Sequence, residues 1–257
     1  MGKIDSYRQE LRKLDDWDAF LLAESRLPGP RGNLELAQAV AEEGDAALFW
    51  RYLQLDVGQA PVNTPQEFLA FCGTLGLGRL LVQGDNEALA ALRRQASDPR
   101  WRVREAVAMA LQRWGEADME ALLGEMAAWS RGNPLERRAA IAALCEPRLL
   151  AEPSHVVRVL EILDVVTFSL LEEQDRKSEA FRALRKGLGY CWSVAVAAHP
   201  AAGKATIAWW LDSADKDVRW VMRENLRKAR LARMDAAWVT AALAQLGRGW
   251  ANRAEAR

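Results

Sequence analysis

Histidine and cysteine are scarce in this chain, and their scarcity limits the chemistry that the protein can perform. The 257 residues include two histidines, His155 and His199, and three cysteines. Neither histidine has a Cys or His partner at the spacing of a zinc site, so we expect no bound metal and no other cofactor. The cysteines are isolated and odd in number, which favours reduced thiols and a cytoplasmic protein. They are Cys72, Cys145 and Cys191.

Long apolar runs and the common catalytic motifs are also missing. No apolar run approaches the length of a membrane-spanning helix, and no charged segment followed by an apolar leader opens the chain, so we expect neither a membrane nor a secreted protein. There is no Gly-x-Ser-x-Gly elbow and no phosphate-binding glycine loop. The glycines of residues 73–78 have the wrong spacing for such a loop, and tight helix packing explains them better. A Ser-His-Asp or Cys-His site whose members meet only in space is left open.

One short phrase is present four times with the same internal spacing. Its first copy reads Val103-Arg104-x-x-Val107-x-x-Ala110-Leu111. At 100° per residue its apolar positions fall on one face of a helix, and the arginine lies at the edge of that face, where its charged head can stay in water. The arginines are 33, 48 and 34 residues apart, the length of stacked helical hairpins. They are Arg104, Arg137, Arg185 and Arg219.

This phrase resembles the HEAT repeat. In that family Asp or Asn in a turn precedes Val-Arg-x-x-Ala-x-x-Ala-Leu on the second helix of a hairpin, and here Asp98, Asn133 and Asp215 stand ahead of three copies. The resemblance covers roughly residues 85–250. It implies an α-α superhelix, a solenoid of stacked antiparallel helix pairs, whose concave surface binds a partner. It implies no particular chemistry, because a fold does not fix a function.

Helical periodicity runs through nearly the whole chain, and no strong strand pattern interrupts it. We therefore predict an all-α fold in one continuous domain, residues 1–257. Within it we expect irregular helical hairpins at 1–84, HEAT-like repeats at 85–250 and a frayed tail at 251–257. Gly115 should end the helix that carries the first copy, since glycine is the usual residue just past a helix C-terminus.

Charge is unevenly distributed along the chain. The 35 basic and 35 acidic residues cancel overall. Residues 181–257, however, hold 14 basic and 6 acidic side chains, and residues 1–180 hold 21 and 29, so the two parts carry about +8 and −8. This asymmetry favours an acidic or polyanionic partner at the C-terminal part. A polar cap on a terminal repeat would give the same asymmetry.

The last copy carries more basic residues than the repeat requires. Five of them span about 80° of helix circumference: Lys216, Arg219, Arg223, Arg227 and Arg230. The repeat explains only Arg219, because the other copies have no basic residue at the positions of Arg223 and Arg227. Trp220 lies beside this row. The preceding copy adds Arg182, Arg185 and Lys186.

Arginines beside an indole suit phosphate contact and base stacking. The same pattern can be a solvated surface, or its cations can pair with acidic residues of a neighbouring helix. We predict that these nine side chains bind a protein partner or a nucleic acid. The primary prediction is a non-catalytic HEAT-repeat scaffold that uses its concave surface and this basic surface.

An enzyme on the same scaffold is the alternative. The chain also looks like the DNA alkylation-repair glycosylases of bacteria, in its repeat helices and in its basic, Trp-rich C-terminal part. That resemblance implies DNA binding, and hydrolysis in which aromatic residues and a carboxylate stabilise a cationic sugar. Trp114 with Glu116 and Asp118 is the nearest local grouping, and the two carboxylates are the catalytic candidates. They do not align with the catalytic motif of that family, and a Trp114 that packs and an Asp118 that caps a helix explain the grouping better.

Overall fold

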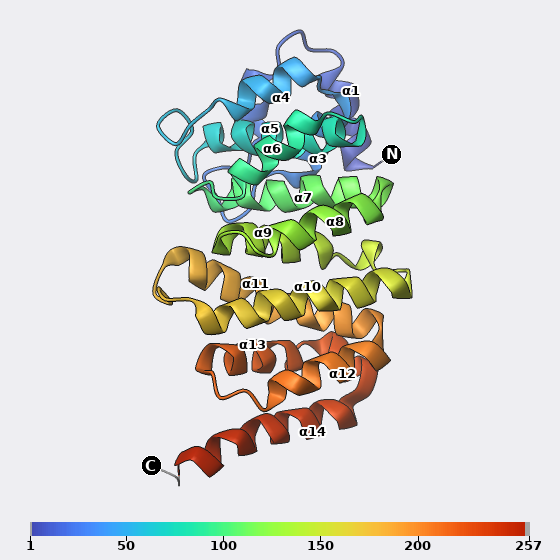
Figure 1. Ribbon diagram of the computed structural model, residues 1–257. Helices are drawn as coiled ribbons and strands as arrows, with labels where there is room; N and C mark the ends of the chain where they lie inside the picture. Colours follow the sequence, from blue (N-terminus) through green and yellow to red (C-terminus); the bar gives the residue numbers. More distant parts are fainter. Residues whose placement is uncertain (1, 255–257) are drawn as a thin grey trace. The chain divides into compact units, whose positions relative to one another are not determined.

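The computed structural model describes the backbone of residues 2–254 and the side chains of residues 2–247 (Figure 1). This part of the chain contains fourteen α-helices, one short 3-10 helix and no strand. The predicted all-α fold of stacked helix pairs is confirmed. The chain divides into two compact units, Met1–Asp118 and Met119–Arg257, which are described separately below. The single domain over residues 1–257 stays a prediction.

The first unit is organised around one helix that is buried almost all round. This helix, α5, contacts α2, α3, α4, α6 and α7. The glycines of α5 allow neighbouring helices to pack close to its backbone. A Cβ on Gly78 would lie 2.6 Å from the carbonyl oxygen of Ala110 on α7, so this residue must stay small. The helices are α1 (Lys3–Leu11), α2 (Asp18–Glu24), α3 (Leu34–Glu43), α4 (Ala46–Leu53), α5 (Pro65–Val82), α6 (Asn86–Gln95) and α7 (Trp101–Ala117).

The second unit is a stack of helix pairs in two layers. In one layer α9 contacts α11 and α11 contacts α13, and in the other α8, α10, α12 and α14 follow one another. Trp129 and Trp192 are fully buried, and the Trp192 indole donates to Thr167 Oγ1 at 2.9 Å. The elements are α8 (Met119–Trp129), α9 (Pro134–Leu144), η1 (Pro147–Leu149), α10 (Pro153–Glu172), α11 (Glu179–Ala198), α12 (Pro200–Leu211), α13 (Lys216–Leu226) and α14 (Ala229–Ala254).

All four copies of the phrase lie on second helices of pairs, namely α7, α9, α11 and α13. The expected caps are present at two of them. Asn133 accepts from the backbone N–H groups of Leu135 and Glu136, and Asp215 accepts from those of Asp217 and Val218. These bonds satisfy N–H groups that have no partner within the helix, and so fix where α9 and α13 begin.

Two predicted boundaries differ from the structure. Gly115 does not end the first repeat helix, because α7 continues through it to Ala117 and Gly115 is buried there. Burial of the surrounding helix outweighs the roughly 1 kcal/mol that glycine costs inside a helix. The expected tail is helical as far as Ala254, and residues 255–257 lie outside the described part of the chain. Within α14, Asp235 is non-helical, and its carboxylate accepts from the backbone N–H of Trp238.

Candidate binding surface on the second helices

The repeat arginines are structural in two copies. Arg104 is buried, and its Nη1 donates to the carbonyl oxygens of Asp98 at 2.7 Å and Pro99 at 3.1 Å. Arg219 is also buried, and it donates to the carbonyls of Ser213 and Leu246. In both copies the guanidinium donates to a carbonyl in the turn that follows the first helix of the pair, and Arg219 also donates to a carbonyl of α14. The expectation that these charged heads stay in water is therefore wrong, and Arg219 is directed into the protein.

Arg185 is only half-buried, and it belongs to a charge cluster between α11 and α13. Its Nη1 lies 2.5 Å from Asp217 Oδ1, while Arg176 Nη1 lies 2.5 Å from Asp215 Oδ2 and 3.2 Å from Asp217 Oδ2. Burial acts to raise the pKa of Asp215, but hydrogen bonds from Arg176 and two backbone N–H groups outweigh it and the pKa is lowered. Two arginines and two carboxylates thus neutralise one another.

Trp220 is packed between the same two helices. The guanidinium carbon of Arg185 lies 4.4 Å from the centre of its ring. On α11, a Cβ added to Gly189 would lie 3.0 Å from the edge of the indole, so the absence of a side chain there makes room for Trp220. One face of the indole is therefore occupied by a cation of the same chain, and Trp220 is half-buried.

Four of the predicted cations remain available to a partner. Arg182, Lys186 and Lys216 are exposed and Arg223 is half-buried. None of the four side chains forms an ion pair or a hydrogen bond within the part of the chain whose side chains are described. By contrast, Arg227 pairs with Glu224 at 3.4 Å, and Arg230 donates to the Tyr190 hydroxyl at 2.6 Å and stacks over its ring at 4.7 Å. The nine predicted residues are thus not equivalent. The predicted single row of five cations is also broken, because α13 ends at Leu226 and Arg230 lies on α14.

Position in the repeat explains which side chains face outward. On all three second helices of the second unit, the residues three before, one after and five after the repeat arginine are exposed or half-buried. We call these positions the outward positions. On α9 they are Pro134, Arg138 and Ala142, on α11 Arg182, Lys186 and Tyr190, and on α13 Lys216, Trp220 and Glu224. The sequence reasoning missed Tyr190, which is 46% exposed and could have been found from this spacing.

The two catalytic candidates lie at the C-terminal end of α7. Glu116 and Asp118 are both exposed, and Trp114 is half-buried. The backbone N–H of Asp118 donates to the Trp114 carbonyl at 2.8 Å, and Asp118 directly precedes α8. Both carboxylates already have interactions within the chain. Their catalytic role stays a prediction. Neither carboxylate lies in a buried environment of the kind that prepares a carboxyl group for acid or base catalysis.

Neither the histidines nor the cysteines are among the residues of this surface. His155 Nε2 lies 3.1 Å from Glu120 Oε1, and His199 accepts from the backbone N–H of Ala202 at 3.4 Å. All three cysteines are free thiols and buried, and burial raises the pKa of Cys72. Over the described residues, no group of three or more His, Cys, Asp or Glu could hold a metal ion. No described helix is both long enough and apolar enough to cross a membrane.

Comparison with known proteins agrees with the repeat pattern. Residues 70–158 match the family model for HEAT repeats. No curated protein and no solved structure matches the chain. The matched segment includes α7 and α9, which carry the first two copies of the phrase, while the copies on α11 and α13 share the spacing and the same place in the helix pairs. Residues 70–158 therefore resemble HEAT repeats in sequence.

Proposed function

We propose that this chain is a non-catalytic scaffold that binds an acidic segment of a partner protein through basic side chains of α11 and α13. The observation that carries the proposal is the group of four cations without partners, Arg182, Lys186, Lys216 and Arg223, on two helices that contact each other. A carboxylate of a partner would form ion pairs there without displacing an existing one. Tyr190 adds an exposed aromatic ring beside these cations.

The geometry favours an acidic protein segment over a nucleic acid. Base stacking needs a free aromatic face, and Arg185 already covers one face of Trp220. Two of the cations that the sequence assigned to phosphate contact are occupied within the chain, because Arg219 is directed inward and Arg185 is paired with Asp217. Residues 1–180 also carry an acidic excess, 29 against 21, which repels a long polyanion.

Fluorescence anisotropy of the full chain with three labelled probes tests the proposal. The probes are a peptide of alternating Glu and aliphatic residues, a single-stranded oligonucleotide and a DNA duplex, all carrying the same fluorescent label. We expect the peptide to bind at low salt and the nucleic acids to bind more weakly. Arg182→Glu with Lys186→Glu should reduce peptide affinity at least tenfold, because each reversal replaces attraction by repulsion.

The matched control reverses two exposed cations of the second unit that lie outside α11 and α13, Arg131→Glu with Arg148→Glu. Equal losses in both double variants would reduce the effect to net charge and would overturn the proposed surface. Tighter binding of duplex DNA with a steep salt dependence would instead favour the DNA-binding alternative. Base release from alkylated duplex DNA that is lost in Glu116→Gln or Asp118→Asn would establish the enzyme, whereas we expect no release above background.

A further inference from the structure

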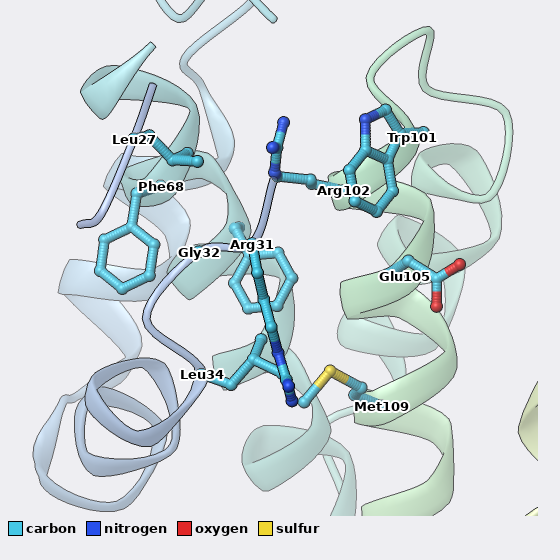
Figure 2. Close-up of a pocket in the computed structure, with 10 residues that line it drawn as sticks. Leu27, Arg31, Gly32, Leu34, Phe68, Trp101, Arg102, Glu105 and Met109 are labelled. Atoms are coloured by element: carbon cyan, nitrogen blue, oxygen red, sulfur yellow. The ribbon is translucent and has the colours of Figure 1, made fainter. Parts of the chain in front are cut away.

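A cavity of about 210 Å³ lies in the first unit (Figure 2). Three elements and one loop form it. Its walls are mainly apolar and include two aromatic rings of α5, and α7 forms the opposite wall. The apolar lining is Leu27, Leu34, Phe68, Phe71 and Met109, and the polar or amphipathic lining is Arg31, Trp101, Arg102 and Glu105, with Gly32 completing it.

Arg102 forms a fixed polar wall of this cavity. Its side chain is 7% exposed and extends from α7 toward the loop at residues 27–32 (Figure 2). Nη1 lies 2.9 Å from Glu67 Oε2, and Nη2 donates to the carbonyl of Gly29 at 2.5 Å and to Asn63 Oδ1 at 3.1 Å. Arg102 Nε, however, is buried without a hydrogen-bond acceptor among the described residues. A buried donor without an acceptor is costly, and a bound ligand can supply the acceptor.

Arg31 supplies a second positive charge at the same cavity. It is exposed, and it has no ion pair or hydrogen bond within the part of the chain that the structure describes. In Figure 2 its side chain extends from the loop across the cavity toward Met109. Trp101, 45% exposed, stacks on the Arg102 guanidinium at 4.5 Å and extends the aromatic wall outward. The cavity therefore combines an apolar interior with an unpaired cation and an unsatisfied donor.

We infer that this cavity binds an aromatic carboxylate, whose ring lies among Phe68, Phe71 and Met109 and whose carboxylate pairs with Arg31. The volume is below the roughly 300–1,000 Å³ of pockets for drug-sized ligands, so it admits one ring system and a short tail. A single negative charge fits better than a phosphate of charge about −2, because Glu105 also lines the cavity and Glu67 already neutralises Arg102. The source is either a small free acid or the aromatic C-terminal residue of a peptide.

Titration calorimetry of the full chain with two matched pairs of probes tests the inference. Indole-3-propionate and its amide represent a free acid, and N-acetyltryptophan and its amide represent a peptide terminus. We expect at least one acid to bind and its amide to bind at least tenfold more weakly, because the amide lacks the charge that pairs with Arg31. Binding of only one acid identifies the source, and either result supports the inference.

Arg31→Gln should lower the affinity for the acid to that of the amide. The matched control is Arg26→Gln, an exposed arginine of the same loop region that pairs with Glu35 at 3.5 Å and does not line the cavity. That variant should bind the acid like the wild type, and melting curves should show both variants folded. The inference is overturned if neither acid binds the wild type, if acid and amide bind equally, or if the two variants lose the same affinity.

Discussion

The same face of a repeat helix has different surroundings in the two units. On α7 the outward positions are Trp101, Glu105 and Met109, and on α11 they are Arg182, Lys186 and Tyr190. In the first unit these positions form a cavity wall together with the loop at residues 27–32 and helix α5. In the second unit the α11 positions are all exposed. The repeat thus determines which positions face outward, while the residues there and the elements next to them determine what can bind.

A second difference concerns the inward position six residues after the repeat arginine. In α7 it is Ala110, packed against Gly78 of α5. In α13 it is Asn225, whose amide bonds to α11: Oδ1 accepts from Ser193 N–H and Nδ2 donates to the Leu188 carbonyl, each at 2.8 Å. One contact depends on the absence of side-chain volume, and the other on a polar group with its partners in place. The same place in the repeat is therefore stabilised in different ways.

The largest expected effect concerns the polar wall of the cavity. Arg102→Met leaves Glu67, which is fully buried, without its ion pair, and should cost about 3–5 kcal/mol in the free energy of unfolding. Urea denaturation of the variant measures this cost. The double variant Arg102→Met with Glu67→Leu should recover most of it, because it removes both buried charges. A single variant as stable as the wild type would mean that Arg102 does not form this wall.

The next effect tests the inward position. Asn225→Ala should cost about 2–3 kcal/mol, because the Ser193 N–H and the Leu188 carbonyl lose a buried partner. Thermal or urea unfolding gives the value. The reciprocal variant Ala110→Asn should be at least as costly, since the carbonyl of Ala110 lies against Gly78 and the alanine is fully buried. Tolerance of both exchanges would remove the distinction between the two packing modes.

A smaller effect is expected at the edge of the basic surface. Tyr190→Leu removes both the hydroxyl that accepts from Arg230 and the ring beneath its guanidinium. Because the pair is exposed, the loss in unfolding free energy should stay below about 1 kcal/mol. Affinity for the acidic peptide should change more than stability, since Tyr190 lies beside the free cations. A stability loss of several kcal/mol would instead assign Tyr190 to the core.

The smallest effect is a pH dependence in the first unit. The hydrogen bond from Arg12, and then that from Arg8, lower the pKa of Glu43 to about 2 against the opposing effect of burial. Since the folded pKa lies below the ordinary value of 4.5, this carboxylate stabilises the protein above about pH 4.5 and loses that contribution as the pH falls toward 2. Glu43→Gln should therefore flatten the acid side of the stability curve.

The control for this measurement is an exposed carboxylate. Glu10 Oε1 lies 2.8 Å from Lys13 Nζ, and both side chains are more than half exposed. Glu10→Gln removes this surface ion pair. It should leave the acid side of the curve almost unchanged, because exposed pairs contribute little. Identical curves for both variants would show that the Arg12 and Arg8 pairs do not stabilise the fold.

Several local features could be read from the sequence because their causes are local. Helical periodicity and the phrase spacing follow from 3.6 residues per turn, and the caps at Asn133 and Asp215 depend on groups two or three residues apart. The end of α7 could not be read in this way. Gly115 has a local tendency to end a helix, but burial of the helix around it depends on residues that are distant in the sequence.

The sequence by itself determined that this is an all-α protein with HEAT-like repeats, and it placed seven of the nine predicted binding residues on the second helices α11 and α13. Only the tertiary structure decided which of those charges are available: Arg219 binds carbonyl groups inside the protein, Arg185 pairs with Asp217, and Arg182 remains exposed. The cavity beside Arg102 was likewise decided only by the tertiary structure. The physical reason is that the helix face on which a side chain lies is fixed by its own helix. Its burial and its partners depend on other elements, which come together only when the chain folds.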